Sequence, residues 1–268
     1  MGRQGKQRLD ALVVERGLAE TRARAQTIIQ GGGITVNGTV VTKPAASVAP
    51  DVELALVRQP LPYVSRGGLK LKHALDAFDV SAAHKVCADI GASTGGFTDV
   101  LLQEGAERVY AIDVGYGQLA WTLRNDPRVV VMERVNIRHV ESLPEPVALA
   151  VVDVSFISLR QVLPPVRALL AAEANVVVLI KPQFEAGRDQ VGKKGVVRDP
   201  AVWADVLGGI LGWAEQHGWS VLGLEPSPIR GPAGNVEFLA HLRPVTGAGI
   251  DVPGAMARVV RDASRHSS

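Results

Sequence analysis

The amino-acid sequence predicts an α/β protein in which a small α+β module precedes a larger, doubly wound domain with a mostly parallel sheet. The first observation is a glycine-dense turn, DIGASTGGF at residues 89–97, which follows a short apolar run and precedes a helical pattern. The second is a regular alternation of short apolar runs with amphipathic segments after this turn. The third is a late pair of apolar segments around a Pro/Gly-rich turn, which indicates an antiparallel strand at the end of the sheet.

Length and composition are those of an ordinary globular protein. The chain has 268 residues, 47% of them hydrophobic and 21% charged, which allows one large domain or a small domain joined to a mid-sized one. Its one cysteine, Cys87, lies in an apolar run, where a buried side chain is more common than a nucleophile or a ligand. The sequence has neither a signal-peptide pattern nor a long apolar run, so we expect a cytoplasmic protein.

The first part of the chain is basic. Residues 1–62 contain eight Lys or Arg against five acidic residues, which gives this part a charge of +3 and leaves the remainder at −1. A small basic module ahead of a nearly neutral domain suggests that the module holds a polyanion for the domain. A solvated basic surface without a ligand explains the charge equally well, so charge alone does not decide between them.

The basic module is predicted to contain two short helices and a hairpin. Apolar residues follow a helical spacing over residues 8–16, and again over 22–30 after Thr21, the expected N-cap. The pair Asn37-Gly38 lies between β-branched residues and is a strong signal for a type I′ turn. A further strand is expected shortly after this hairpin.

Two arginines, Arg22 and Arg24, lie in the first turn of the second predicted helix, where cations oppose the helix dipole. This unfavourable placement suggests that they serve an external anion, with a structural role of the arginines as the alternative. The stretch from residue 8 to residue 44 resembles the small RNA-binding domain shared by a ribosomal small-subunit protein, tyrosyl-tRNA synthetases and pseudouridine synthases. The resemblance implies that the phosphate contacts are Arg8, Arg22, Arg24 and Lys43.

The next helix, which directly precedes the glycine turn, carries a basic stripe. Two prolines within residues 59–62 first indicate a short, stiff connection. Beyond it, Arg66, Lys70 and His73 fall on one face of the predicted helix, beside an apolar face. Such a stripe is most often a solvated flank, but this helix is in place to overhang the ligand end of the glycine turn.

Short apolar runs of the kind buried on both faces of a parallel sheet occur at residues 109–113, 129–132, 148–153 and 176–181. A long helix is expected at 201–217, and an earlier helical segment is expected to bend or divide at Pro164-Pro165. The Gly/Ala/Ser-rich end indicates a loose tail, with at most a short helix near 256–263. The expected divisions are the basic module, a linker, the larger domain and the tail, at residues 1–59, 60–64, 65–243 and 244–268.

The glycine turn lacks the GxGxxG spacing of NAD-binding enzymes, since Gly91 is followed by Gly95 and Gly96. A second acidic residue, Asp113, ends the next apolar run, where a carboxylate can accept hydrogen bonds from ribose hydroxyls. Sites for NAD and for S-adenosylmethionine (SAM) share this feature, and an aspartate that caps a turn is a further alternative. These residues therefore predict a nucleotide-like ligand without identifying it.

Three more polar residues are attached to late apolar runs. Asp153 closes one run, Lys181 closes the next, and Glu237 lies in the last one. Each has an ordinary explanation by itself, as a turn cap, a lysine that reaches solvent, or the polar half of strand alternation. Parallel strands, however, deliver Asp153 and Lys181 to the same sheet edge as Asp89 and Asp113, and a lysine that meets a carboxylate at a ligand cleft is typical of an active site.

Five segments together closely resemble the TlyA family, whose members are historically labelled hemolysins and are related to FtsJ-type ribose methyltransferases. In chain order they are SRGGLKL, GASTGGFTD, VVDVSFISL, LIKPQFE and SPIRGPAGNVEF. The resemblance covers nearly the whole chain, including the basic module. It implies a Rossmann-like sheet of the SAM-dependent methyltransferases with a late antiparallel strand, preceded by a small α+β RNA-binding domain.

The resemblance also implies site residues. Methyltransferases of this kind use a Lys, Asp, Lys, Glu tetrad, which falls on Lys70, Asp153, Lys181 and Glu237. The implied contacts with the cofactor SAM are Asp89, Gly91, Ala92, Ser93, Thr94, Gly95, Gly96, Phe97, Asp113 and Asn136. Arg66 is a further expected RNA contact, and no metal is expected.

The implied reaction is methyl transfer from SAM to a ribose 2′-hydroxyl of ribosomal RNA, at a cytidine, in free RNA or in ribosomal subunits. A protonated sugar hydroxyl is a poor nucleophile, so the site should help to remove its proton. Lys181 is the candidate general base, oriented by Asp153 and Glu237. If Lys181 stays charged, it would stabilise the developing alkoxide instead.

Three other functions remain open at this point. The first is an RNA-binding ribosome-assembly factor with a non-catalytic cofactor pocket. The second is a membrane-lytic hemolysin, against which the lack of signal, transmembrane and membrane-active amphipathic segments argues. The third is a methyltransferase that acts on a base rather than on a ribose.

Overall fold

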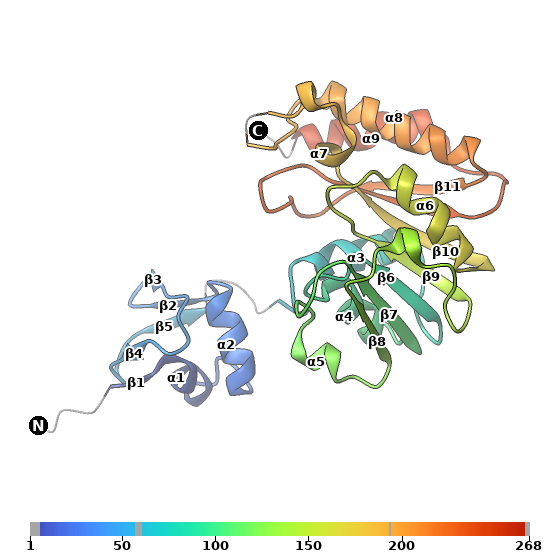
Figure 1. The fold of residues 1–268 in the computed structure, drawn as a ribbon. Coiled ribbons are helices and arrows are strands. Elements are labelled where there is room, and N and C mark those ends of the chain that lie inside the picture. Colours follow the sequence, from blue (N-terminus) through green and yellow to red (C-terminus); the bar gives the residue numbers. More distant parts are fainter. Residues whose placement is uncertain (1–5, 57–60, 193, 266–268) are drawn as a thin grey trace, which may run out of the picture. The chain divides into compact units, whose positions relative to one another are not determined.

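The protein, as a computed structural model, is described at residues 6–56, 61–192 and 194–265. It forms two compact units, which divide between Val64 and Ser65 (Figure 1). The linker expected at residues 60–64 lies partly outside the described residues, because residue 60 is not among them.

The N-terminal unit contains two helices and short antiparallel strands. The helices are α1 (Leu9–Glu15) and α2 (Arg22–Gln30), and the strands are β1 (Gln7–Arg8), β2 (Ile34–Val36), β3 (Thr39–Val40), β4 (Ser47–Val48) and β5 (Leu54–Leu56). A three-stranded sheet has the order β3-β2-β5, and β1 pairs with β4. The Thr21 side chain accepts a hydrogen bond from the Arg24 amide, and Asn37 and Gly38 have φ of 50° and 78°. The predicted N-cap and type I′ turn are therefore both confirmed.

The second unit is built on a seven-stranded sheet in the order β11-β12-β10-β9-β6-β7-β8 (Figure 1). Its strands are β6 (Val86–Ile90), β7 (Arg108–Asp113), β8 (Val129–Glu133), β9 (Val147–Val152), β10 (Leu170–Ile180), β11 (Ser220–Pro226) and β12 (Phe238–Arg243). Neighbours from β10 to β8 run parallel, whereas β12 is antiparallel to both β10 and β11. The predicted mostly parallel sheet with a late antiparallel strand is confirmed.

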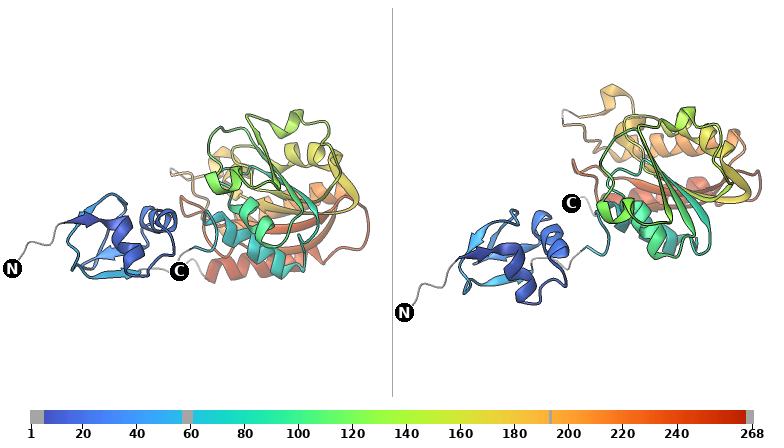
Figure 2. Two further views of the ribbon diagram at one scale, coloured as in Figure 1. Left: turned by 90° about the horizontal axis from the view of Figure 1, so that it is seen from below. Right: turned by 60° about the horizontal axis from the view of Figure 1, so that its bottom comes forward.

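Helices cover both faces of this sheet, as the further views in Figure 2 also show. They are α3 (Gly67–Ala77), α4 (Gly96–Gln103), α5 (Trp121–Arg124), α6 (Leu159–Ala168), α7 (Pro182–Glu185), α8 (Pro200–Gln216) and α9 (Val252–Arg265), with short 3₁₀ turns η1 (Ile137–His139) and η2 (Arg188–Gln190). Strand β6 shows how the faces differ: Ala88 and Ile90 pack into the core cluster that contains α6 and α8, whereas Asp89 bonds to Thr98 of α4. Alternation along the strand thus sends neighbouring residues to opposite layers.

Two expectations about helices need correction. Helix α6 continues through Pro164 and Pro165 instead of dividing there, and Pro164 lies only five residues after the first residue of the helix. The short helix expected near 256–263 is part of the 14-residue helix α9, but the segment is not a loose tail, because α9 lies against α8 and β11. Val252 and Val259 of α9 are buried in the main core, so apolar contacts fix this helix to the domain.

No helix among the described residues has the length and apolar character needed to cross a membrane.

Candidate active site

The glycine turn after β6 brings two strand ends very close together. Gly91 has φ of +88°, a conformation that side chains rarely adopt, and its amide donates to the Ile112 carbonyl over 2.8 Å. A Cβ atom added at Gly91 would lie 2.4 Å from the Asp153 carbonyl oxygen. Only glycine therefore allows the turn after β6 to meet the end of β9, where Asp153 is placed.

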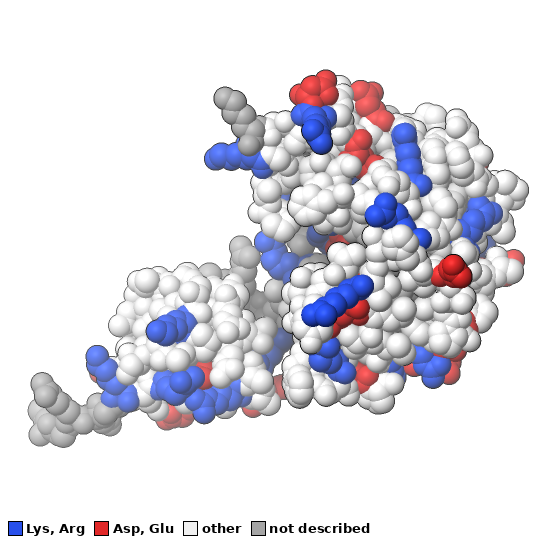
Figure 3. Space-filling view, in the orientation of Figure 1, with Lys and Arg blue, Asp and Glu red and all other residues white. Residues whose placement is uncertain are grey.

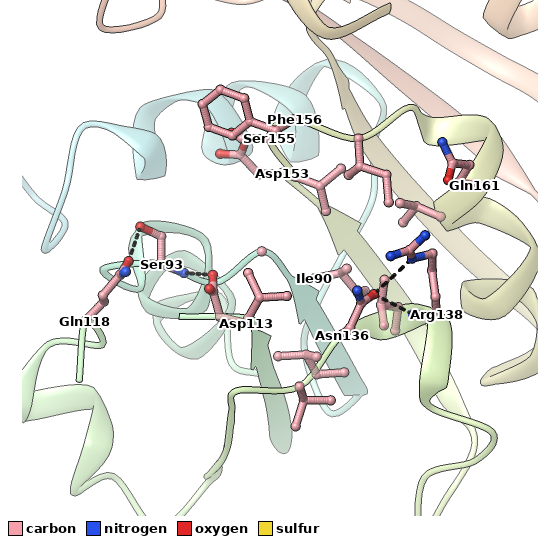
Figure 4. Close-up of a pocket in the computed structure, with 18 residues that line it drawn as sticks. Ile90, Ser93, Asp113, Gln118, Asn136, Arg138, Asp153, Ser155, Phe156 and Gln161 are labelled. Carbon is pink, nitrogen blue, oxygen red and sulfur yellow. Dashed lines mark hydrogen bonds between the residues drawn. The ribbon is translucent and has the colours of Figure 1, made fainter. Parts of the chain in front are cut away.

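A cavity of about 570 Å³ opens at the carboxyl ends of β6, β7 and β9. Figure 4 shows its lining, with Ser93 and Gln118 together at one part of the wall and Asn136 beside Arg138 at another. Among the predicted cofactor contacts, those that line it are Gly91, Ser93, Asp113 and Asn136. Asp153 of the predicted tetrad also lines it. The position agrees with the rule that ligands of doubly wound sheets bind outside the carboxyl ends of the strands.

Asp113 is fixed in the cavity by backbone hydrogen bonds. Its carboxylate accepts from the amide of Ser93 over 2.8 Å and from the amide of Gly115 over 2.6 Å. An ionised carboxylate has about four acceptor positions, so two remain for a ligand with vicinal hydroxyls. Asn136 is held in a similar way, because its side-chain oxygen accepts from the Arg138 amide over 3.1 Å.

The other residues predicted to contact the cofactor shape the turn and do not line the cavity. They are Asp89, Ala92, Thr94, Gly95, Gly96 and Phe97. Asp89 is fully buried and accepts a hydrogen bond from the Thr98 hydroxyl over 2.7 Å, and burial raises its pKa to about 7. Gly96 lies directly against the first turn of α3, since a Cβ there would lie 2.9 Å from the Gly68 amide nitrogen.

The tetrad residues form two ion pairs at the same edge of the sheet. Lys181 Nζ lies 2.5 Å from Asp153 Oδ1, and Lys70 Nζ lies 2.5 Å from Glu237 Oε2. Lys70, Lys181 and Glu237 are all buried, with exposed fractions of 7%, 8% and 2%. Because buried charges are rarely found without partners, this edge of the sheet is built to hold two lysines and two carboxylates in a fixed arrangement.

The fold explains how these residues converge. Lys181 directly follows β10, and Asp153 directly follows β9, which runs parallel to β10. Glu237 directly precedes β12 rather than lying within it, and β12 runs antiparallel to β10. Lys70 comes from α3, whose apolar residues pack against the domain while the lysine reaches the sheet edge.

Three residues that were not predicted belong to this site. Ser155 Oγ accepts a hydrogen bond from Lys181 over 3.0 Å, and Gln183 donates to Glu237 over 3.4 Å. Phe156 also lines the cavity, although its side chain is 89% exposed and its φ is 62° (Figure 4). The sequence signal for Phe156 was a large apolar residue three positions after the strand-end Asp153, and its ring lies 4.7 Å from that of Phe184.

The predicted RNA contacts are divided between the two units. In the N-terminal unit, Arg8 and Arg22 both bond to the buried carboxylate of Asp10, and Lys43 is exposed. Arg24 does not join them, because its guanidinium donates to the Leu61 carbonyl. Arg66, in the second unit, is exposed just before α3. Among the described residues no group of His, Cys, Asp and Glu could hold a metal ion.

Comparisons with known families agree with this division into parts. Residues 63–244 match the FtsJ-like methyltransferase family, and residues 7–54 match the S4 domain family. A Mycobacterium tuberculosis protein named 16S/23S rRNA (cytidine-2′-O)-methyltransferase TlyA is 46% identical over 250 residues, which cover 92% of this chain and 93% of that protein. A Brachyspira hyodysenteriae protein named Hemolysin A is 43% identical over 237 residues, which cover 87% of this chain and 98% of that protein.

Solved structures support the same assignment. A Streptococcus thermophilus protein labelled as a hemolysin has 45% identity and a TM-score of 0.78, and the match covers 98% of each chain. A methyltransferase of Listeria monocytogenes that depends on S-adenosylmethionine has 14% identity and a TM-score of 0.50, over 66% of this chain and 98% of the other, which shows a shared fold alone. The resemblance to TlyA proteins is confirmed. The chain therefore belongs to the FtsJ-like methyltransferase family and carries an S4 domain ahead of its methyltransferase domain.

Proposed function

We propose that the protein transfers the methyl group of SAM to the ribose 2′-hydroxyl of a cytidine in ribosomal RNA. The observation that carries this proposal is the pair of buried Lys–carboxylate contacts, Lys181 with Asp153 and Lys70 with Glu237, beside the cavity at the strand ends. The identity of the substrate is supported by the relatives named as cytidine-2′-O-methyltransferases of 16S and 23S rRNA.

The cavity suits SAM in size and in the chemistry of its lining. A volume of about 570 Å³ lies within the usual range for ligand pockets. Asp113 offers acceptor positions to the ribose hydroxyls, Asn136 offers an amide to the edge of the adenine, and the turn at Gly91 lets backbone approach the ligand closely. When bound, SAM supplies a methyl group on a positively charged sulfur.

Lys181 is the residue that we place against the target hydroxyl. Its ion pair with Asp153 and its hydrogen bond to Ser155 fix the ammonium group at the carboxyl ends of β9 and β10. An ammonium group held in this way stabilises the negative charge that develops on the ribose oxygen as this oxygen bonds to the methyl carbon and the hydroxyl proton passes to solvent water. Lys70 and Glu237 form the second pair, which we assign to holding the ribose in line with the methyl group.

The S4 domain is proposed to bind the RNA that the second domain modifies. Its basic residues Arg8, Arg22 and Lys43 would contact phosphates, which position a substrate without specifying its sequence. Arg66 would add a phosphate contact from the methyltransferase domain.

The proposal is tested by incubating the purified protein with tritium-labelled SAM and with unmodified small or large ribosomal subunits. Because a 2′-O-methyl group blocks alkaline cleavage of the adjacent phosphodiester, the label should remain in alkali-resistant dinucleotides. Label recovered in mononucleotides would instead place the methyl on a base. Absence of label in both subunits, with SAM binding intact, would favour an assembly factor over an enzyme.

A further inference from the structure

One carboxylate in the N-terminal unit accepts hydrogen bonds from side chains of two separate segments. Asp10 of α1 is fully buried. Arg8 donates to it through Nε over 3.0 Å and through Nη2 over 2.8 Å, and Arg22 through Nη2 over 3.3 Å. Gln26, one turn after Arg22 on α2, adds a bond of 2.8 Å. A single acidic side chain therefore fixes two arginines that come from β1 and from α2.

This arrangement is more than neutralisation of a buried acid. Two guanidinium groups repel each other, and each side chain loses much rotamer freedom when it is held in place. The Arg8 and Arg22 side chains nevertheless remain 48% and 56% exposed, and their contacts with Asp10 use only part of their N–H groups. The remaining N–H groups are available to a ligand in solution, in an orientation that is fixed before the ligand arrives.

The loop that carries Lys43 is anchored at the same point. The Asp10 amide donates to the Pro44 carbonyl over 3.0 Å, and the Leu9 amide donates to the Ala46 carbonyl over 2.8 Å. The main chain beside Lys43 is thus tied to the residue that holds the two arginines. Figure 3 shows several Lys and Arg side chains close together on the visible face of this unit.

We propose that Asp10 is a positioning residue, and that the Arg8 and Arg22 guanidinium groups fixed on it form one preformed site for a phosphodiester group of RNA. This inference rests on the proposed function, because it takes RNA as the ligand of the S4 domain. The inference goes beyond the proposed function because it assigns a required role in RNA binding to an acidic residue, whose charge RNA would repel. The role is indirect: Asp10 acts through Arg8 and Arg22 and does not touch the RNA.

A positioning role for Asp10 and its negative charge alone predict opposite effects of Asp10→Asn on the affinity for RNA. Asp10→Asn removes a negative charge from a basic domain, which by Coulomb attraction alone should tighten binding to RNA. If Asp10 positions the arginines, the same substitution should weaken binding, because two flexible arginines must then be ordered by the RNA. Asp51→Asn is the matched control, since it makes the same charge change at an exposed position of the same domain.

The test measures the dissociation constant of the full-length protein for a protein-free transcript of 16S rRNA, at several salt concentrations. We expect Asp10→Asn to raise the dissociation constant at least about fivefold and to lower the salt slope by about one, as expected for the loss of one phosphate contact. Asp51→Asn should bind as tightly as wild type or more tightly. Equal or tighter binding by Asp10→Asn would overturn the inference.

A second set of variants separates positioning from general stabilisation of the fold. Asp10→Asn made in a background of Arg8→Gln and Arg22→Gln should cause no further loss of binding, because its effect passes through these arginines. A further loss of similar size would mean that Asp10 only supports the domain. Arg8→Lys, which keeps the charge but removes the two-pronged contact, should also weaken binding, and an unchanged constant would contradict the preformed site even if Asp10→Asn fails to fold.

These results do not depend on catalysis. If wild type transfers no methyl group to ribosomal subunits, the proposed function fails, while the comparison of RNA binding between wild type and Asp10→Asn still decides the role of Asp10. If methylation is observed, Asp10→Asn should raise the KM for the RNA and leave kcat unchanged, since the reacting groups lie in the other domain.

Discussion

Lys181 and Glu237 occupy neighbouring positions at one edge of the sheet, because antiparallel pairing sets Ile180 of β10 opposite Phe238 of β12. Each of the two charged residues nevertheless forms its ion pair with a different residue. Lys181 lies against Asp153, and Glu237 lies against Lys70. The antiparallel strand β12 begins at the edge where β9 and β10 end, so the residue just before it, Glu237, brings a second ion pair beside the first.

The arrangement predicts that Lys181 is needed for catalysis and not for cofactor binding. Lys181→Ala should reduce kcat for RNA methylation by about 100-fold or more, because it removes a preorganised charge from the site of the developing oxyanion. The dissociation constant for SAM, measured by calorimetry, should change less than about threefold. Lys72→Ala provides the control, since Lys72 lies on the surface of α3 and pairs with Asp76 and Glu104.

Lys181→Arg distinguishes the two roles that a lysine can take here. Arginine keeps the positive charge but cannot act as a base in a protein. Partial activity in Lys181→Arg would support electrostatic stabilisation, whereas a variant as inactive as Lys181→Ala would point to proton removal or to a strict geometric requirement.

Asp113 is predicted to bind the cofactor without taking part in methyl transfer. Asp113→Asn should weaken SAM binding about tenfold or more, since hydrogen bonds to a charged group are each worth about 1.5–3 kcal/mol. The value of kcat at saturating SAM should be nearly unchanged. Glu107→Gln, an exposed change in the loop before β7, should leave both quantities as in wild type. A large fall in kcat with an unchanged dissociation constant for SAM would contradict the assignment of Asp113 to the cofactor site.

Two glycine substitutions are expected to have opposite effects on stability. Gly91→Ala places a methyl group 2.4 Å from the Asp153 carbonyl oxygen at a positive φ, so it should lower the free energy of unfolding by at least about 2 kcal/mol. Gly212→Ala lies inside α8 with nothing within 4 Å, and it should raise the free energy of unfolding by roughly 0.5–1 kcal/mol. Thermal unfolding of the two variants beside wild type checks the pair, and equal melting temperatures would contradict the packing described for the turn.

The fold was largely predictable because its signals are local. Short apolar runs ending in Asp113, Asp153 and Lys181 indicated parallel strands, and a glycine turn after the first run indicated the ligand end of the sheet. Only a short helix near 256–263 was expected where α9 lies, and its full extent was not predicted for a physical reason. Its Gly and Ala content suggests disorder, and its stability comes from burying Val259 against elements that are distant in sequence.

The site was predictable only in part, because strand ends show which residues meet but not where their side chains turn. Asp89 and Asp113 both end apolar runs, yet Asp113 faces the cavity and Asp89 faces α4. Arg22 and Arg24 look equivalent in sequence, but residues two apart on a helix point to different sides. Arg22 therefore reaches Asp10, whereas Arg24 reaches Leu61.

His241 should make the stability of the protein depend on pH. Burial, with a smaller contribution from Arg243, lowers the pKa of His241 to about 4, and its ring bonds to Asn175 and stacks on Phe78. In the unfolded chain the imidazole takes up a proton below about pH 6.5, so unfolding is favoured increasingly as the pH falls from 6.5 toward 4. The loss should reach roughly 2–3 kcal/mol.

The check is the melting temperature as a function of pH in wild type and in His241→Gln. The variant, which keeps a hydrogen-bond donor but does not titrate, should lose less stability between pH 6.5 and pH 4.5. His139→Gln, at an exposed position, should follow the wild-type curve. Identical curves for wild type and His241→Gln would show that this histidine is not held neutral in the fold.

The central claim, methyl transfer to a cytidine ribose by the Lys70–Asp153–Lys181–Glu237 site, is tested most directly by mass spectrometry of nucleosides. Unmodified ribosomal subunits would be incubated with SAM and either wild type or Lys181→Ala, and the RNA would then be digested to nucleosides. We predict 2′-O-methylcytidine with wild type and none above background with the variant, although both bind SAM. A methyl group on the base, or equal 2′-O-methylcytidine from the two proteins, would contradict the account.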